Sequence, residues 1–98
     1  MIPPDTSILT AAHALVHGDR GEAYDHPAVD YRRTADIFAM LTGIELTPEE
    51  GVLFMLAVKL SRLARGVQAD FPPCELRDTV VDAAGYLECY WAAVTYDD

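Results

Sequence analysis

Apolar residues recur along this chain at intervals of three and four, the spacing of one helix face, and no segment keeps the alternation of a β-strand. The first such pattern predicts a helix over residues 6–17. Asp5 or Thr6 is its expected N-cap, and Gly18 is its expected stop. Its apolar positions are Ile8, Leu9, Ala12, Leu15 and Val16.

A second helix is predicted over residues 27–41, ending near Gly43. Pro27 suits the first position of a helix, and Asp25 or His26 stands beside it as a cap. The large apolar side chains of this helix are expected to point largely inward; they are Val29, Ile37, Phe38, Met40 and Leu41.

The clearest local signal is the run Thr47-Pro48-Glu49-Glu50, which predicts a capping box at the start of a third helix. In this box the Thr47 side chain caps the helix and Glu50 reaches back to Thr47. The helix is expected to continue to Gly66. Its middle is apolar nearly all round, which predicts a central place in a bundle.

A fourth helix is predicted to follow the break at residues 70–73 and to extend to about Tyr96. Its expected core side consists of Leu76, Val80, Ala83, Ala84, Leu87, Trp91 and Val94. The 98 residues are the usual size of one domain. Together the patterns predict a single all-α domain of about four helices.

Charge and composition narrow the classes of partner. Seven Lys and Arg against sixteen Asp and Glu give a formal charge of −9, so an extended nucleic-acid partner is not expected. No run approaches the ~20 apolar residues of a membrane span. Half of this small chain is hydrophobic, and self-association would cover apolar surface that one domain leaves exposed. We expect a homo-oligomer.

The N-terminal residues and the cysteines favour a cytoplasmic location. The opening MIPPDTS has neither the basic region nor the apolar run of a signal peptide. Cys74 and Cys89 lie on the predicted fourth helix, roughly 22 Å apart at 1.5 Å per residue, which is too far for a disulfide. Thiols that form no disulfide are typical of a reducing compartment.

The polar stretch HGDRGEAYDHP, residues 17–27, is the first candidate for chemistry. Aromatic and Arg planes can stack on a nucleotide base, while His and Asp can bind its edges. The residues of this kind are Asp19, Arg20, Tyr24 and His26. The plainer interpretation makes the aspartates turn and cap formers and the tyrosines half-buried rim residues.

The second candidate is a polar cluster shared by the third and fourth helices. Lys59 and Arg62 are neighbours on one helix face, and Asp78 and Asp82 are neighbours on the other, with Tyr86 one turn beyond. Two interpretations stay open: an ion-pair network that fixes helix register, or the floor of a pocket whose cations bind phosphate. Asp78 and Asp82 are also candidate ligands for Mg²⁺.

Three segments in order, DRGEAYDHPAVDYRRTADIF, TPEEGVLFMLAVKLSRL and RDTVVDAAGY, are similar to a family of small phage and prophage proteins. That family is related to the MazG-like all-α nucleoside triphosphate pyrophosphohydrolases. The resemblance covers residues 19–86. It implies a helical bundle that assembles as a dimer or tetramer, with nucleotide pockets near the subunit interfaces.

The resemblance also implies where a metal site would lie. In active MazG-like enzymes an E-E-x-x-E motif and a later E-x-x-D motif hold Mg²⁺, which activates a water for attack between the α- and β-phosphates. Here Asp82 matches the final Asp of the later motif. The place of the earlier motif, residues 58–62, carries Lys59 and Arg62 where carboxylates would stand.

We therefore predict a nucleotide-binding protein on a MazG-like scaffold with a degenerate metal site, one that sequesters a nucleotide such as a signalling nucleotide of host defence. Its expected ligand-binding residues are Asp19, Arg20, Tyr24, His26, Lys59, Arg62 and Tyr86. Two alternatives stay open. One is a Mg²⁺-dependent nucleoside triphosphate pyrophosphohydrolase using Asp78 and Asp82, and the other is a non-catalytic interaction module.

Overall fold

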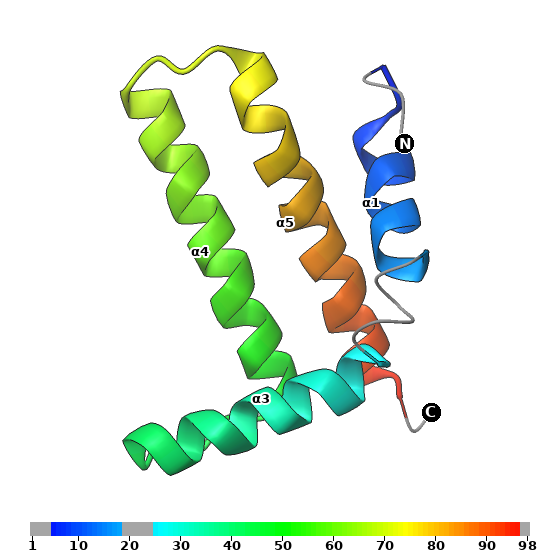
Figure 1. Ribbon diagram of the computed structural model, residues 1–98, viewed down its shortest axis with the longest axis vertical. Helices are drawn as coiled ribbons and strands as arrows, with labels where there is room; N and C mark the ends of the chain where they lie inside the picture. The colour runs from blue at the N-terminus through cyan, green and yellow to red at the C-terminus, as the bar shows by residue number, and fades with distance from the viewer. Residues whose placement is uncertain (1–4, 19–24, 97–98) are drawn as a thin grey trace.

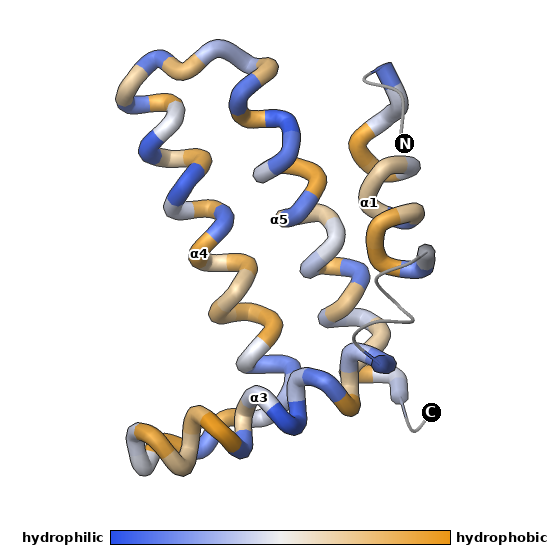
Figure 2. Tube along the Cα trace, in the orientation of Figure 1, coloured by the Kyte–Doolittle hydropathy of each residue, from blue (hydrophilic) through white to orange (hydrophobic). Residues whose placement is uncertain are grey.

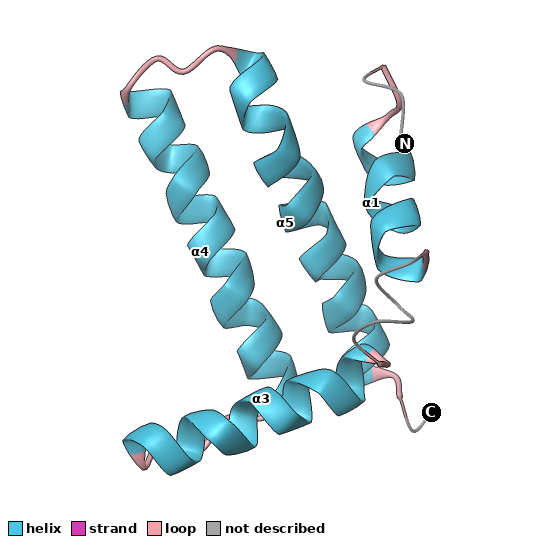
Figure 3. Ribbon diagram, viewed as in Figure 1, coloured by secondary structure: helices cyan, strands magenta, loops and turns pink. Residues whose placement is uncertain are grey.

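The computed structural model describes residues 5–18 and 25–96, and these residues form helices with no strand among them (Figure 3). The helices are α1 (Ile8–His17), α3 (Pro27–Thr42), α4 (Pro48–Gln68) and α5 (Pro73–Val94). The predicted all-α class and the order of the elements are confirmed for this part of the chain.

An antiparallel pair, α4 and α5, is the frame on which the other helices are placed (Figure 1). Helix α1 lies along α5, on the side away from α4. Helix α3 crosses the end of the pair opposite to the α4–α5 turn, contacts both helices, and extends past α4 (Figure 1). As a result α1, α3 and α5 come together around the second half of α5.

Local capping decides where the helices begin and end. The Thr47 hydroxyl accepts from the Glu50 N–H at 3.2 Å, and Glu50 Oε1 accepts from the Thr47 N–H at 2.9 Å, so the predicted capping box is present. His26 caps α3, and Gly43 ends it in the left-handed conformation that glycine adopts most easily. The predicted first cap was wrong, because Ser7 takes that role in place of Asp5 or Thr6.

Two predicted helix ends differ from the structure by a few residues. Helix α4 continues past Gly66 to Gln68, and α5 stops at Val94, before Tyr96. Gly66 is not a stop but a contact point: a Cβ there would collide with the Leu76 side chain at the start of α5. The missing side chain thus lets the two helices approach closely beside their turn.

The core is small. Its buried apolar residues within the described chain are Ala11, Ala12, Ala35, Val52 and Ala83. Val52 is the one large side chain among them that is fully buried. Most of the larger apolar side chains are therefore at least partly accessible to solvent.

Several residues predicted to point inward are exposed instead. They are Val29, Ile37, Met40 and Leu41 of α3 and Leu87, Trp91 and Val94 of α5. Figure 2 shows the apolar colouring continuing to the end of α3 that extends past α4. Helical periodicity identifies an apolar face correctly, but it does not say whether another element of the same chain covers that face.

No helix in the described part of the chain is both long and apolar enough to cross a membrane. Cys74 and Cys89 both lie on α5, as predicted, and are not joined by a disulfide.

We expect the substitution Thr47→Ala to lower the free energy of unfolding by about 1 kcal/mol, because the α4 N-terminus loses a side-chain cap. Urea denaturation followed by circular dichroism measures this change. The control is Ser61→Ala, at an exposed position inside the same helix. An equal loss in both variants would contradict a capping role for Thr47.

The capping box also predicts that the free energy of unfolding depends on pH in the acid range. Hydrogen bonds from the Thr47 backbone and side chain lower the pKa of the Glu50 carboxyl in the folded protein. The stability that this carboxylate contributes is therefore present above its ordinary pKa and is lost as the pH falls through the lowered value. Urea midpoints measured across the acid range should depend less on pH in Glu50→Gln than in the unsubstituted protein, whereas Glu49→Gln should keep the dependence.

Candidate functional site

An ion pair joins α4 to α5 in the middle of the molecule. Lys59 Nζ lies 3.0 Å from Asp82 Oδ2, and the two side chains are only 14% and 25% exposed. Withdrawal from water makes each charge costly unless it is paired. The structure thus shows that Lys59 pairs with Asp82.

The other members of the predicted cluster are placed differently. Arg62 and Asp78 are exposed, and no ion pair of either is formed within the described residues. Arg62 follows Lys59 by three residues, so it stands one helical turn along the same side of α4. The cluster therefore contains one tight pair, Lys59 with Asp82, and two solvent-facing side chains of opposite charge, Arg62 and Asp78.

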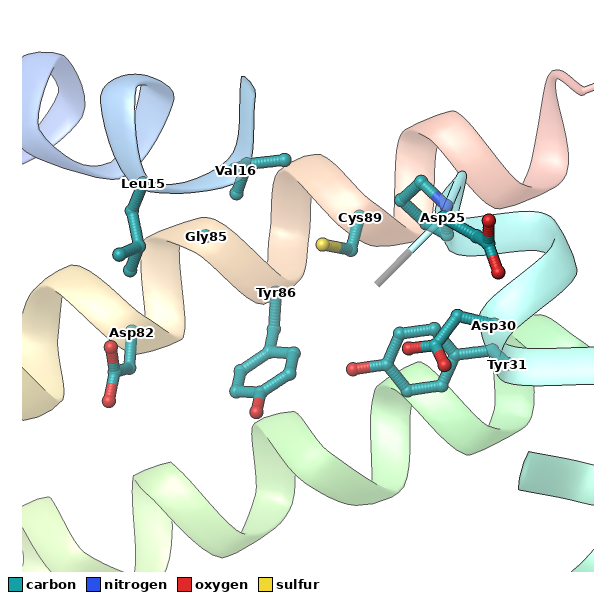
Figure 4. Close-up of a pocket in the computed structure, with 10 residues that line it drawn as sticks. Leu15, Val16, Asp25, Asp30, Tyr31, Asp82, Gly85, Tyr86 and Cys89 are labelled. Atoms are coloured by element: carbon teal, nitrogen blue, oxygen red, sulfur yellow. The ribbon is translucent and has the colours of Figure 1, made fainter. Parts of the chain in front are cut away.

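A cavity of about 200 Å³ lies next to this pair, where α1, α3 and α5 meet (Figure 4). Leu15 and Val16 of α1 and Pro27 of α3 form its apolar part. Its polar lining is made by Asp25, Asp30, Tyr31, Asp82, Tyr86 and Cys89. Three carboxylates and two phenols thus face one small volume.

Helix packing explains why these side chains converge. Gly85 lies where α1 crosses α5, and a Cβ there would stand 3.3 Å from Val16 Cγ2. Between α4 and α3, the Tyr31 ring packs against Gly51, where a Cβ would stand 3.5 Å from Tyr31 Cδ1, an ordinary van der Waals contact. Gly85 thus lets α1 approach α5 closely on one side of the cavity, and Tyr31 reaches the cavity from α3.

Tyr31 is the most perturbed group in the site. Burial is the largest cause that raises the pKa of its phenol, because the charged form loses contact with water. The neighbouring ionisable groups of Tyr86, Cys89 and Asp30 raise this pKa further by repelling a negative charge. A side-chain hydrogen bond with Tyr86 acts in the same direction. Figure 4 shows the Tyr31 ring pointing along the cavity toward Tyr86, which stands on α5 beyond Asp82. The Tyr31 phenol is therefore held uncharged in a partly dry environment, with the Tyr86 side chain as its neighbour.

A second cavity, of about 330 Å³, opens between α1 and α5 on the other side of Asp82. Asp78 and Asp82 both line it, together with Arg77. The structure thus brings the two predicted metal ligands to one cavity wall. However, Asp82 already holds the Lys59 ammonium, and the described residues contain no group of three His, Cys, Asp or Glu side chains placed to hold a metal ion. This donor set does not form a ready cation site.

The polar stretch of residues 17–27 is described only at its ends. Asp19, Arg20 and Tyr24 lie outside the described residues. His26 Nδ1 accepts from the Ala28 N–H at 3.0 Å, and its ring stacks on Tyr96 with the centroids 4.5 Å apart. The position of His26 is thus explained by helix capping and stacking, and it is not among the residues lining the cavity.

Asp25 contributes to the site although sequence reasoning gave it only a capping role. It adopts a positive φ of 66°, which is uncommon for a residue with a side chain, and its carboxylate accepts from Arg33 at 3.0 Å. The ion pair holds the carboxylate at the cavity edge.

Sequence reasoning missed three further lining residues. Asp30 and Tyr31 carry a weak signal, since they stand three and four residues after Pro27, near the start of a helix that adjoins a polar loop. Cys89 stands two turns from Asp82 on the same face of α5, but nothing in the sequence says that α1 and α3 enclose that side of the helix.

Comparison with known proteins identifies the family. Residues 7–93 match a family described as a domain of unknown function (DUF6378), and the chain belongs to this family. It is 33% identical over 81 residues to the Gene 55 protein of Mycobacterium phage L5 and 30% identical over 83 residues to the Gene 55 protein of Mycobacterium phage D29. These matches cover 82% and 85% of the chain.

The chain spans about half the length of these two relatives, 47% and 50% respectively. The comparisons support the predicted likeness to a family of phage proteins. No solved structure matches significantly.

The Tyr31 environment predicts a late step in the alkaline titration of the five tyrosines. The unfolded chain loses the Tyr31 proton near pH 10, before the folded chain does, so the stability contributed by the neutral phenol is present below that pH and falls above it. Near-ultraviolet absorbance should show the last-titrating phenol, and Tyr31→Phe should remove it.

The control for this titration is Tyr96→Phe, at an exposed tyrosine outside the cavity. It should leave the late step in place. A late step that persists in Tyr31→Phe would show that the burial of this phenol has been assigned wrongly.

Proposed function

We propose that this domain binds a nucleotide, with the base and sugar in the cavity between α1, α3 and α5 and the phosphates toward α4. The observation that carries the proposal is the convergence of two phenols and three carboxylates on one small cavity beside Lys59. The likeness to MazG-like sequences agrees with this assignment.

The cavity suits the uncharged part of a nucleotide. A volume of about 200 Å³ is small for a ligand site, so it accepts a base with part of its sugar rather than a whole triphosphate. The Asp25 and Asp30 carboxylates accept hydrogen bonds from ring and exocyclic N–H groups or from ribose hydroxyls. The Tyr31 and Tyr86 rings offer faces on which a base can stack, a contact worth about 1–3 kcal/mol.

Binding of a phosphate group requires positive charge, and this acidic protein carries positive side chains on α4. Arg62 is exposed and forms no ion pair within the described residues, so a phosphate can bind it without breaking an internal contact. Lys59 lies one turn away, where it is already neutralised by Asp82. We therefore assign first contact with phosphate to Arg62, and to Lys59 the role of holding Asp82 in place.

The same charges favour binding without hydrolysis. A metal-dependent pyrophosphohydrolase needs carboxylates free to hold Mg²⁺, and here Asp82 is engaged by an ammonium group. The proposed protein sequesters its nucleotide. Asp78 and Asp82 line a common cavity wall, which keeps hydrolysis as the second candidate.

Calorimetric titration tests the proposal with a panel of ribonucleotides, deoxyribonucleotides and cyclic nucleotides, each with Mg²⁺ and with a chelator. We expect one class to bind equally well in both conditions, with no released pyrophosphate or phosphate. Arg62→Gln should weaken binding about 10-fold or more, whereas Arg65→Gln makes the same change in net charge at an exposed position on α4 and should have little effect.

A second variant pair tests the cavity. Tyr86→Phe removes one hydroxyl from the lining and should weaken binding several-fold, while Tyr90→Phe, on the same helix but outside the lining, should not. Turnover that requires Mg²⁺ and disappears in Asp82→Asn would show that the protein hydrolyses its nucleotide and does not sequester it. The absence of binding across the whole panel would refute the nucleotide proposal.

A further inference from the structure

The α4–α5 pair carries a long apolar face that no helix of the described chain covers. On α4 the exposed residues Leu53, Ala57, Leu60, Ala64 and Val67 succeed one another at intervals of four and three. On α5 the exposed residues Leu87, Trp91 and Val94 have the same spacing. We call these eight residues the open face. This spacing is that of helices that pack against other helices along a seam.

Both halves of the open face are turned away from the candidate site. Trp91 follows Asp82 by nine residues, which at about 100° per residue places it on the opposite side of α5. The α4 stripe is centred about a third of a turn from Lys59. Because Lys59 meets Asp82 across two antiparallel helices, the two stripes are directed to the same side of the pair.

The size of the exposed surface exceeds what a chain of this length leaves uncovered. Its accessible area is 6855 Å², against roughly 5,500 Å² expected for a compact monomer of this mass. The radius of gyration of 14.6 Å likewise exceeds the value of about 13 Å for a compact domain of this length. The excess, roughly 1,300 Å², is counted over all 98 residues, and the large side chains of the open face, 37–71% exposed, supply part of it. A standard interface takes ~800 Å² from each partner.

The composition of the open face also indicates a helical partner of the same kind. It contains no charged residue, in a protein in which 23% of the residues are charged. Its two alanines on α4 permit close approach of another helix, and its leucines and Trp91 supply bulk. A face that combines small and large apolar side chains in a seven-residue rhythm is complementary to a copy of itself.

We propose that the open face is the interface of a symmetric homodimer, in which the α4–α5 pair of one copy packs against the α4–α5 pair of another. Helix α4 is then buried on both sides, by its own chain at Val52 and Lys59 and by the second copy at Leu60. The proposal is independent of the ligand and places the candidate site on the outer side of the dimer.

Sedimentation velocity and light scattering across a micromolar concentration series test the assembly. We expect a dimer that dissociates on dilution. Leu60→Glu places a carboxylate at the centre of the seam in both copies and should weaken self-association about 100-fold or more. Leu9→Glu introduces the same charge at an exposed leucine of α1, outside the open face, and should leave association unchanged.

Trp91, the one tryptophan of the chain, reports on the interface without any substitution. It is 63% exposed in the single copy, so its emission should be shielded from quenchers in the dimer and should shift to longer wavelength on dilution. This readout remains valid if Leu60→Glu fails to fold. A protein that is monomeric at all concentrations, or a Trp91 signal that does not follow the association, would overturn the proposal, as would equal dissociation by Leu9→Glu and Leu60→Glu.

Discussion

The contact between the Lys59 ammonium and the Asp82 carboxylate fixes the arrangement of α4 against α5, and the remaining features follow from that arrangement. Both charges are largely withdrawn from water, so a shift of one helix along or around the other would leave each of them poorly hydrated and alone. The pair therefore penalises alternative registers more than it adds to stability. It also determines which side of each helix faces α1 and α3.

Once that side is fixed, one helix pair presents two different surfaces. On one side Asp82 and Tyr86 lie with Tyr31, Asp30 and Asp25 around a cavity closed by apolar residues of α1. On the opposite side the exposed apolar residues form the open face. In the proposed function, Lys59 and Arg62 of α4 supply the positive charge that an acidic chain needs to bind a phosphate.

Burial of the open face by a second copy would account for a feature of α4 that the single chain leaves unexplained. The middle of the helix is apolar nearly all round, the pattern of a helix surrounded by protein, yet Leu53, Leu60 and Val67 on one of its sides are exposed. The small core has the same explanation. A domain with few large buried side chains gains stability when association removes further apolar surface from water.

The sequence by itself determined the helices, because their signals act over a few residues. The Thr47 and Glu50 capping box, the prolines at the starts of α3 and α4, and Gly43 at the end of α3 depend on local hydrogen bonds and backbone preferences. The sequence also singled out Lys59, Asp82 and Tyr86, since polar groups on largely apolar helices need partners. It did not choose between an ion pair and a phosphate site.

Only the tertiary structure showed that Lys59 pairs with Asp82 and which residues line the cavity. Tyr31 and Asp30 became neighbours of Asp82 because α3 packs against both α4 and α5, while Gly85 lets α1 close over the same side of α5. The same contacts left Leu87 and Trp91 exposed although their spacing marked them as core. Periodicity records that a helix face is apolar, whereas coverage of that face depends on how the other helices pack.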